Sequence, residues 1–306
     1  MVTRIAGDPP GLPVIVRRDE ALAAGLTRDQ IRQRVRGGHW RRMATGVYLR
    51  SLDTDELEVG DVTRHEHLQR AVAACRARPD CVLGFGSAAA LHGLPMVSGV
   101  PALVQLLVPE GSWTGIRNGV RYREYRLDEN DVQPGAVRVT TAIRTWIDVA
   151  RTHRLPDALS TGDRALAEGQ FSVDDAAWTL SQLGSIRGVR LAAHALSLLD
   201  RRRETPLESW SFAAFASWDI LLPSMQEEFF DAEGLIGRVD FSWPDAHVVG
   251  EADGQLKYAE PGALYAEKRR EDRLRALGLT VVRWGWQDLA QDQFRLRGRI
   301  EAALRR

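Results

Sequence analysis

Three carboxylates, Asp240, Glu251 and Asp253, lie close together near the C-terminal end of the sequence. Glu251 and Asp253 are two residues apart, so on a β-strand their side chains share one face at a spacing of about 7 Å. Residues 243–246 (Trp-Pro-Asp-Ala) predict a turn, and the resulting hairpin would bring Asp240 toward Glu251. Clustered carboxylates repel one another, and hard oxygen ligands favour Mg²⁺ or Mn²⁺. The alternative interpretation is a solvated polar face on an edge hairpin.

The flanking segments predict the elements that position these acids. Thr205 can cap a helix, Pro206 suits its first turn, and Glu208 lies near its positive N-terminus. A charged helix over residues 266–277 ends at Gly278, as expected for a glycine after the last turn. Further strands are expected at residues 228–230 and 279–284, and a last helix begins at Gln287. The predicted order is helix, three strands, helix, strand, helix.

Residues 203–306 resemble the PD-(D/E)XK nuclease superfamily, and within it the very-short-patch-repair-like endonucleases. The residues that carry this resemblance are Glu208, Pro223, Gln226, Asp240, Glu251-Ala-Asp253-Gly254, Arg269, Arg270, Asp272 and Val281-Val-Arg283-Trp284. The resemblance implies a mixed sheet flanked by helices, with a metal site at a forked edge of the sheet. Asp240 would be the central ligand of Mg²⁺ or Mn²⁺ and Glu251 the second, with Asp253 beside them and Glu208 in support.

One position departs from the superfamily pattern. A lysine is expected two residues after the second acid, and this chain has Asp253 there. Lys257, Lys268 or another basic residue of the helix that carries Lys268 would then supply the positive charge. Two classes of function stay open: a metal-dependent endonuclease that hydrolyses DNA phosphodiesters, and a DNA-binding regulator or antitoxin with a degenerate nuclease fold.

Residues 14–50 predict a helix-turn-helix followed by a β-hairpin wing. Thr27 and Gln30 form a capping box for the second helix, and Ile31 and Val35 give it one apolar stripe. Arg28, Arg32 and Arg36 fall on its other side. Two more arginines, Arg41 and Arg42, lie in the predicted wing. This order of elements is typical of a winged helix-turn-helix.

Basic charge is concentrated in this N-terminal segment. Residues 17–50 contain nine arginines and three acids, whereas the whole chain carries no net charge. Such a concentration favours contact with a phosphate backbone, and an arginine-rich surface for protein contacts is the alternative. Residues 24–38 and 46–48 resemble the N-terminal domain of type IV abortive-infection antitoxins. This resemblance implies binding to duplex DNA, repression of an operon and a cognate toxin as a partner.

We therefore expect a multidomain α/β protein with three domains. A winged helix-turn-helix would occupy residues 1–50, an α/β middle domain residues 51–200 and the nuclease-like domain residues 201–306. Two cysteines without nearby histidines do not predict a zinc site, and no apolar run reaches the roughly 18 residues that span a bilayer. Residues 1–12 do not read as a signal peptide, so a cytoplasmic location is expected. The oligomeric state stays open.

Overall fold

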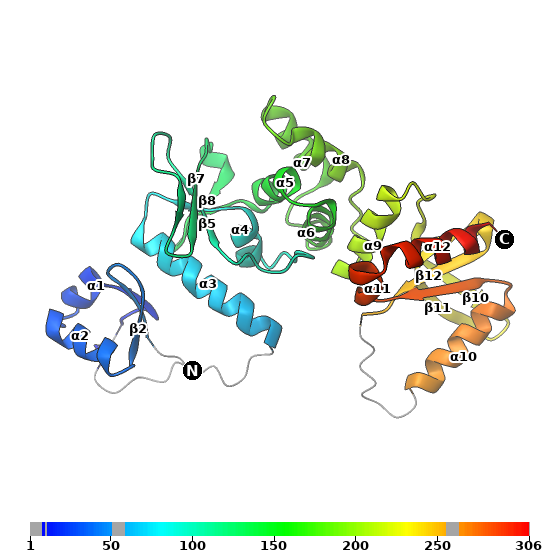
Figure 1. Cartoon of the computed structure of the whole chain (residues 1–306), viewed down its shortest axis with the longest axis horizontal. Coiled ribbons are helices and arrows are strands. Elements are labelled where there is room, and N and C mark those ends of the chain that lie inside the picture. The colour runs from blue at the N-terminus through cyan, green and yellow to red at the C-terminus, as the bar shows by residue number, and fades with distance from the viewer. Residues whose placement is uncertain (1–7, 10, 51–58, 255–262, 306) are drawn as a thin grey trace. The chain divides into compact units, whose positions relative to one another are not determined.

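The structure is a computed structural model that describes residues 8–9, 11–50, 59–254 and 263–305. It confirms the expected mixed α/β, multidomain architecture (Figure 1). The chain packs into two compact units: unit 1 contains residues 1–94 and 98–149, and unit 2 contains residues 95–97 and 150–306. The boundaries expected at residues 50 and 200 concern a finer division and stay predictions. Among the described residues, no helix combines the length and apolar composition needed to cross a bilayer.

Unit 1 begins with two short helices and a small antiparallel sheet in the order β1-β3-β2. The elements are β1 (Ile15–Arg17), α1 (Arg18–Ala23), α2 (Arg28–Arg36), β2 (Trp40–Ala44) and β3 (Val47–Arg50). Thr27 caps α2 as expected, because its Oγ1 accepts from the Gln30 N–H at 3.2 Å while Gln30 Oε1 accepts from the Thr27 N–H at 2.8 Å. Ile31 and Trp40 are buried in the core beneath α2.

The rest of unit 1 is a six-stranded mixed sheet in the order β6-β7-β5-β4-β9-β8. Its strands are β4 (Val82–Leu83), β5 (Val104–Val108), β6 (Gly115–Arg117), β7 (Val120–Glu124), β8 (Val132–Gln133) and β9 (Val139–Thr140). The associated helices are α3 (Val59–Ala77), α4 (Phe85–His92), η1 (Glu129–Asp131) and α5 (Ala142–Thr152). Alanine, cysteine, valine and leucine side chains from α3, α4 and the strands form its core. Figure 1 shows α3 beside the sheet.

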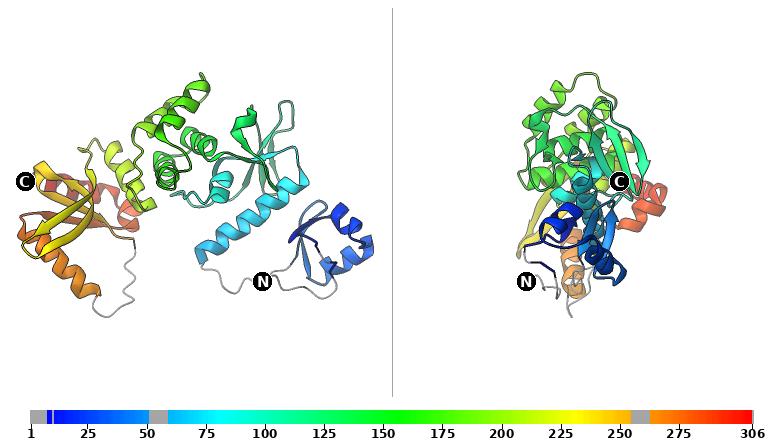
Figure 2. Two further views of the ribbon diagram at one scale, coloured as in Figure 1. Left: turned by 180° about the vertical axis from the view of Figure 1, so that it is seen from behind. Right: turned by 90° about the vertical axis from the view of Figure 1, so that its left-hand side faces the viewer.

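Unit 2 contains a helical part followed by a four-stranded sheet in the order β10-β11-β12-β13 (Figure 2). The helical part is α6 (Leu155–Ala167), α7 (Val173–Gln182) and α8 (Val189–Ser197). The remaining elements are α9 (Pro206–Ser217), β10 (Ser224–Asp231), β11 (Gly234–Trp243), η2 (Pro244–Ala246), β12 (Val248–Ala252), α10 (Ala263–Ala276), β13 (Thr280–Trp284), α11 (Trp286–Gln291) and α12 (Gln293–Leu304). β12 and β13 are parallel, and the other neighbouring pairs are antiparallel.

Helices cover both faces of this sheet. Phe215 of α9 makes T-shaped contacts with Phe241 and Trp284 at ring-centroid distances of 5.3 and 5.6 Å. On the other face, Leu274 of α10 is buried with Val249 and Val281. The predicted order of helices and strands in residues 203–306 is confirmed, except that the last helix is divided at Asp292 into α11 and α12. The predicted turn at 243–246 is the short helix η2, which joins β11 to β12.

Candidate functional site

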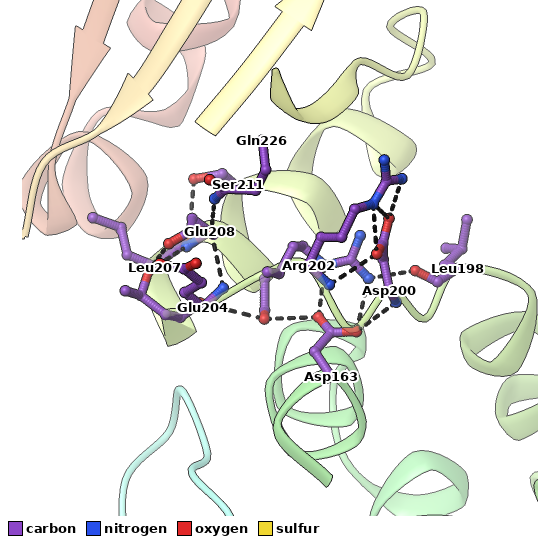
Figure 3. Close-up of polar contacts among 12 residues, drawn as sticks. Asp163, Leu198, Asp200, Arg202, Glu204, Leu207, Glu208, Ser211 and Gln226 are labelled. Atoms are coloured by element: carbon purple, nitrogen blue, oxygen red, sulfur yellow. Dashed lines mark hydrogen bonds and ion pairs between the residues drawn. The ribbon is translucent and has the colours of Figure 1, made fainter. Parts of the chain in front are cut away.

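Glu208 is fixed in place by the local structure at the start of α9. Thr205 is the N-cap, and its Oγ1 accepts from the Glu208 N–H at 3.2 Å and donates to Glu208 Oε1 at 2.7 Å. The backbone N–H of Glu204 donates to Glu208 Oε2 at 3.0 Å. The side chain is buried, so these donors compensate for the hydration that its carboxylate loses. Figure 3 shows Glu208 directed toward this turn and toward Gln226.

A buried ion pair anchors the same turn to α6. Both side chains of the Asp163–Arg203 pair are fully buried, and Arg203 donates to the two carboxylate oxygens at 2.6 and 2.8 Å. Ser209 Oγ also donates to Asp163 Oδ2 at 2.8 Å. An isolated buried carboxylate would be costly, whereas this one has several donors. The start of α9, and with it Glu208, is therefore held rigidly within unit 2.

Gln226 of β10 adds a third constraint on Glu208. Its Nε2 donates to Glu208 Oε2 at 2.9 Å. Gln226 has φ +58°, a left-handed conformation that residues other than glycine rarely adopt. Met225 pairs with Phe241 and Glu227 with Val239, so Gln226 lies opposite Asp240 in the sheet. The strained residue thus lies between two of the acids that the sequence singled out.

The sheet forks at Asp240. β11 and β12 pair from Trp243↔Val248 to Phe241↔Gly250. At the next position the Ala252 N–H donates to the side-chain Oδ2 of Asp240 at 2.8 Å. Burial, together with the negative charges of Glu208 and Asp253, raises the pKa of Asp240 to about 6. Glu208 and Asp253 therefore lie close enough to disfavour the charged form of Asp240.

Glu251 has a different environment. Its side chain is buried, and its two oxygens bind two arginines: Oε1 lies 2.6 Å from Arg270 Nη1 and Oε2 lies 2.7 Å from Arg283 Nη2. Burial raises the pKa of Glu251, and the positive charges of Arg270 and Arg283 oppose that shift. Glu251 is thus an ion-paired carboxylate supported from α10 and β13, whereas the pKa of Asp240 is raised by two neighbouring acids, Glu208 and Asp253.

The two arginines belong to a wider charge network on the α10 side of the sheet. Arg283 also contacts Asp253 through Nη1 at 3.1 Å and forms an ion pair with Glu267. Arg270 Nη2 donates to the carbonyl of Arg238 at 2.8 Å. Gly237 makes room for this arrangement, because a Cβ there would lie 2.7 Å from Arg270 Nε and its φ of +148° favours glycine.

The structure places most of the site residues that the sequence predicted. Glu208 and Asp253 raise the pKa of Asp240 at the fork, and Glu251 is held by the two arginines. Lys257 lies outside the described residues. Lys268 is exposed on α10, whereas its neighbour Arg270 reaches Glu251. The sequence included Arg270 and Arg283 in the motif without assigning them a role, because their contacts depend on long-range packing.

The donor set fits a hard divalent cation in its chemistry, since carboxylate oxygens are the ligands that Mg²⁺ and Mn²⁺ prefer. A cation near Asp240 would also relieve the repulsion that raises its pKa. In the arrangement of the described residues, no group of three or more acidic, histidine or cysteine side chains is close enough to hold a metal ion. A metal would therefore require these carboxylates to move, and Glu251 to exchange a guanidinium contact for the ion.

The five candidate DNA-contacting arginines are all exposed in unit 1. Arg28, Arg32 and Arg36 lie along α2, while Arg41 and Arg42 lie on β2. The α2 arginines lie on the surface because Ile31 faces the core. Arg32 forms an exposed ion pair with Asp29 at 2.8 Å, and Arg41 donates to Gln69 Oε1 at 3.2 Å.

One surface cleft in unit 2 lies away from these acids. It opens at the η2 end of the hairpin, between Leu221, Trp243, His247 and Thr280. The residues that line it include none of Glu208, Asp240, Glu251 or Asp253. The cleft and the acidic fork therefore lie at opposite ends of the β11–β12 pairing.

The chain is similar to two proteins from different strains of Mycobacterium tuberculosis. They are described as uncharacterized proteins MT2308 and Rv2248, and each is 28% identical to this chain over 285 residues, which is 92% of this chain and 98% of the relative. No model of a known protein family matches the chain. A crystal structure of the RV2827C protein from Mycobacterium tuberculosis covers 72% of this chain and 85% of its own, with 13% identity and a TM-score of 0.40.

Proposed function

We propose that the protein is a DNA-binding, divalent-metal-dependent endonuclease that hydrolyses DNA phosphodiesters. The observation that supports this most strongly is the fork at Asp240. There the Asp240 carboxylate accepts a hydrogen bond from the Ala252 N–H, and burial together with Glu208 and Asp253 raises its pKa to about 6. Carboxylates with perturbed pKa values are concentrated at functional sites. A stable surface would not need to crowd acids in this way.

Asp240, Glu251 and Asp253 would hold the ion, with Glu208 beside them. When bound, Mg²⁺ or Mn²⁺ supplies Lewis-acid stabilisation of phosphoryl charge and lowers the pKa of a bound water. The Ala252 N–H fixes the orientation of the Asp240 carboxylate, and Gln226 and Thr205 fix that of Glu208. These contacts orient Asp240 and Glu208, whereas Glu251 would have to exchange a guanidinium contact for the ion.

Arg270 is our candidate for the positive charge that the superfamily pattern assigns to a lysine. It lies 2.6 Å from Glu251, and Gly237 leaves space for it. A guanidinium stays protonated, so it would stabilise negative charge on a phosphate without acting as a proton acceptor. Arg28, Arg32 and Arg36 on α2 would bind duplex DNA, and Arg41 and Arg42 on β2 would add phosphate contacts. A cytoplasmic location is part of this proposal.

A second function has its own supporting observation. Both oxygens of Glu251 bind guanidinium groups, those of Arg270 and Arg283. The two arginines could replace a metal ion as the structural partners of this buried acid. The protein would then be a non-cleaving DNA-binding regulator or antitoxin that contacts a cognate toxin. Isothermal titration with Mn²⁺ distinguishes the two functions. Binding by wild type that is lost in Asp240→Asn and retained in Asp245→Asn supports the nuclease. No binding by wild type favours the regulator.

A further inference from the structure

An exposed tryptophan lies on the outer edge of the six-stranded sheet in unit 1. Trp113 is 59% exposed and lies two residues before the start of β6, the edge strand that pairs with β7. Its ring lies 5.8 Å from that of Tyr122 of β7, with an interplanar angle of 59°. The position of β7 in the sheet can be followed in Figure 1. Neither the acidic fork nor the α2 surface includes these two aromatic residues.

The indole of Trp113 is ordered by packing even though it is exposed. Gly115 pairs with Tyr122 across the two strands, and a Cβ on Gly115 would lie 2.8 Å from Trp113 Cζ2. Gly115 also has φ +140°, which favours glycine. The ring therefore lies over Gly115 and beside Tyr122 with one part facing solvent. Because this packing already restricts the ring, a stacked ligand would lose less entropy in ordering it.

Two arginines lie close to this aromatic pair. The Arg78 guanidinium lies 5.9 Å from the centre of the Tyr122 ring. Arg117 pairs with Val120, two residues before Tyr122, so it shares the face of Tyr122 and is exposed. Among the residues that the structure describes, no acidic side chain forms an ion pair with Arg117, whereas Arg78 pairs with Asp80 at 2.9 Å. An aromatic platform flanked by arginines is complementary to bases and phosphates.

We propose that this β6–β7 edge binds single-stranded nucleic acid. A base stacks on Trp113, and Arg117 and Arg78 contact the neighbouring phosphates. Stacking on an exposed ring is possible for unpaired bases, whereas paired bases inside a duplex keep their faces covered. The surface is thus separate from the proposed duplex-binding arginines of α2 and the proposed metal site, and its occupancy does not depend on either.

Anisotropy of fluorescein-labelled single strands tests the proposal on the full-length protein. The probes are oligo(dT) and oligo(U) of roughly 12 nucleotides, within the length that such surfaces bind, and a DNA duplex of the same length. Trp113→Ala is expected to weaken binding of a single strand about tenfold and to leave duplex binding unchanged. Trp178→Ala is the matched control, because Trp178 is 67% exposed on α7 of unit 2. Comparison of oligo(dT) with oligo(U) identifies whether DNA or RNA is preferred.

Three results would overturn the proposal. The first is that wild type binds neither oligo(dT) nor oligo(U). The second is that Trp113→Ala binds both as well as wild type does, and the third is that Trp178→Ala loses as much affinity as Trp113→Ala. A variant that replaces Arg117 by Ala should lower the salt dependence of single-strand binding by about one phosphate contact, and an unchanged slope contradicts its assigned role. Unchanged melting temperatures of the variants confirm that the comparisons concern folded protein.

Discussion

The backbone N–H of Ala252 donates to the carboxylate of Asp240 at 2.8 Å, one step beyond the last pair of β11 and β12. A side chain thus takes the place of a strand partner where the sheet forks. Asp240 is held at that point although burial and neighbouring acids raise its pKa. This combination of fixed geometry and unfavourable charge is the basis of the proposed metal site.

Asp240→Asn should stabilise the metal-free protein. Asparagine can still accept from Ala252, while the charge repelled by Glu208 and Asp253 is removed. We expect a gain on the order of 1–2 kcal/mol at pH 8, less than the full value of the pKa shift because the surroundings relax. Thermal or urea unfolding with EDTA measures it, and Asp245→Asn on η2 is the control. A loss of stability in Asp240→Asn would contradict the repulsion.

Arg270→Ala should lower cleavage by about two orders of magnitude with little change in DNA affinity, since it removes one positive charge from the site. It should also destabilise unit 2 by about 1–3 kcal/mol, because Glu251 then keeps only Arg283 as its partner. Arg270→Lys should restore part of the activity, and Lys268→Ala should change little.

Single-turnover cleavage at saturating DNA measures these effects, with Lys257→Ala assayed in parallel. A large loss in Lys257→Ala together with normal turnover in Arg270→Ala would transfer the role to the lysine. Normal turnover in all three alanine variants would show that no side-chain cation is needed.

Replacing Arg28, Arg32 and Arg36 together by alanine should weaken duplex binding and reduce the salt dependence of the affinity. Each lost phosphate contact should lower the slope of log K against log salt by about 0.9. Three exposed arginines of unit 2 provide a triple-alanine control with the same change in charge: Arg164 on α6, Arg187 between α7 and α8, and Arg190 on α8. Equal affinity and slope in the two triple variants would exclude the α2 surface as the duplex-binding site.

The stability of unit 1 should depend on pH through Asp148, independently of the acidic fork in unit 2. Burial, with a smaller effect of Asp131, raises its pKa to about 7 despite the opposing charge of Arg144. The folded state therefore binds a proton more tightly than the unfolded state. This contribution to stability is present below about pH 4 and is lost as the pH rises to 7. In the wild type, the free energy of unfolding should therefore fall as the pH rises from 5 to 7. Asp148→Asn should reduce this fall by on the order of 1 kcal/mol per pH unit, as measured by urea unfolding at pH 5, 6 and 7. Parallel profiles for wild type and variant would contradict the shift.

Local sequence signals predicted the elements well, because the responsible contacts span a few residues. The capping box of Thr27 with Gln30, the helix N-cap at Thr205 and the turn predicted at 243–246 are of this kind. The ion pairs of Glu251 could not be predicted, because they require the register of β12 with β13 and the placement of α10. The positive φ of Gln226 also had no local signal, since glycine or asparagine is the usual residue for that conformation.

Cleavage of DNA by the purified full-length protein tests the central claim most directly. Supercoiled plasmid, linear duplex, mismatched duplex and single strands are incubated with Mg²⁺ or Mn²⁺, and with EDTA. We predict metal-dependent cleavage of at least one substrate that falls by at least about a hundredfold in Asp240→Asn and Glu251→Gln and is retained in Asp245→Asn. Cleavage that persists in Asp240→Asn, or no cleavage of any substrate by wild type, would contradict the nuclease assignment.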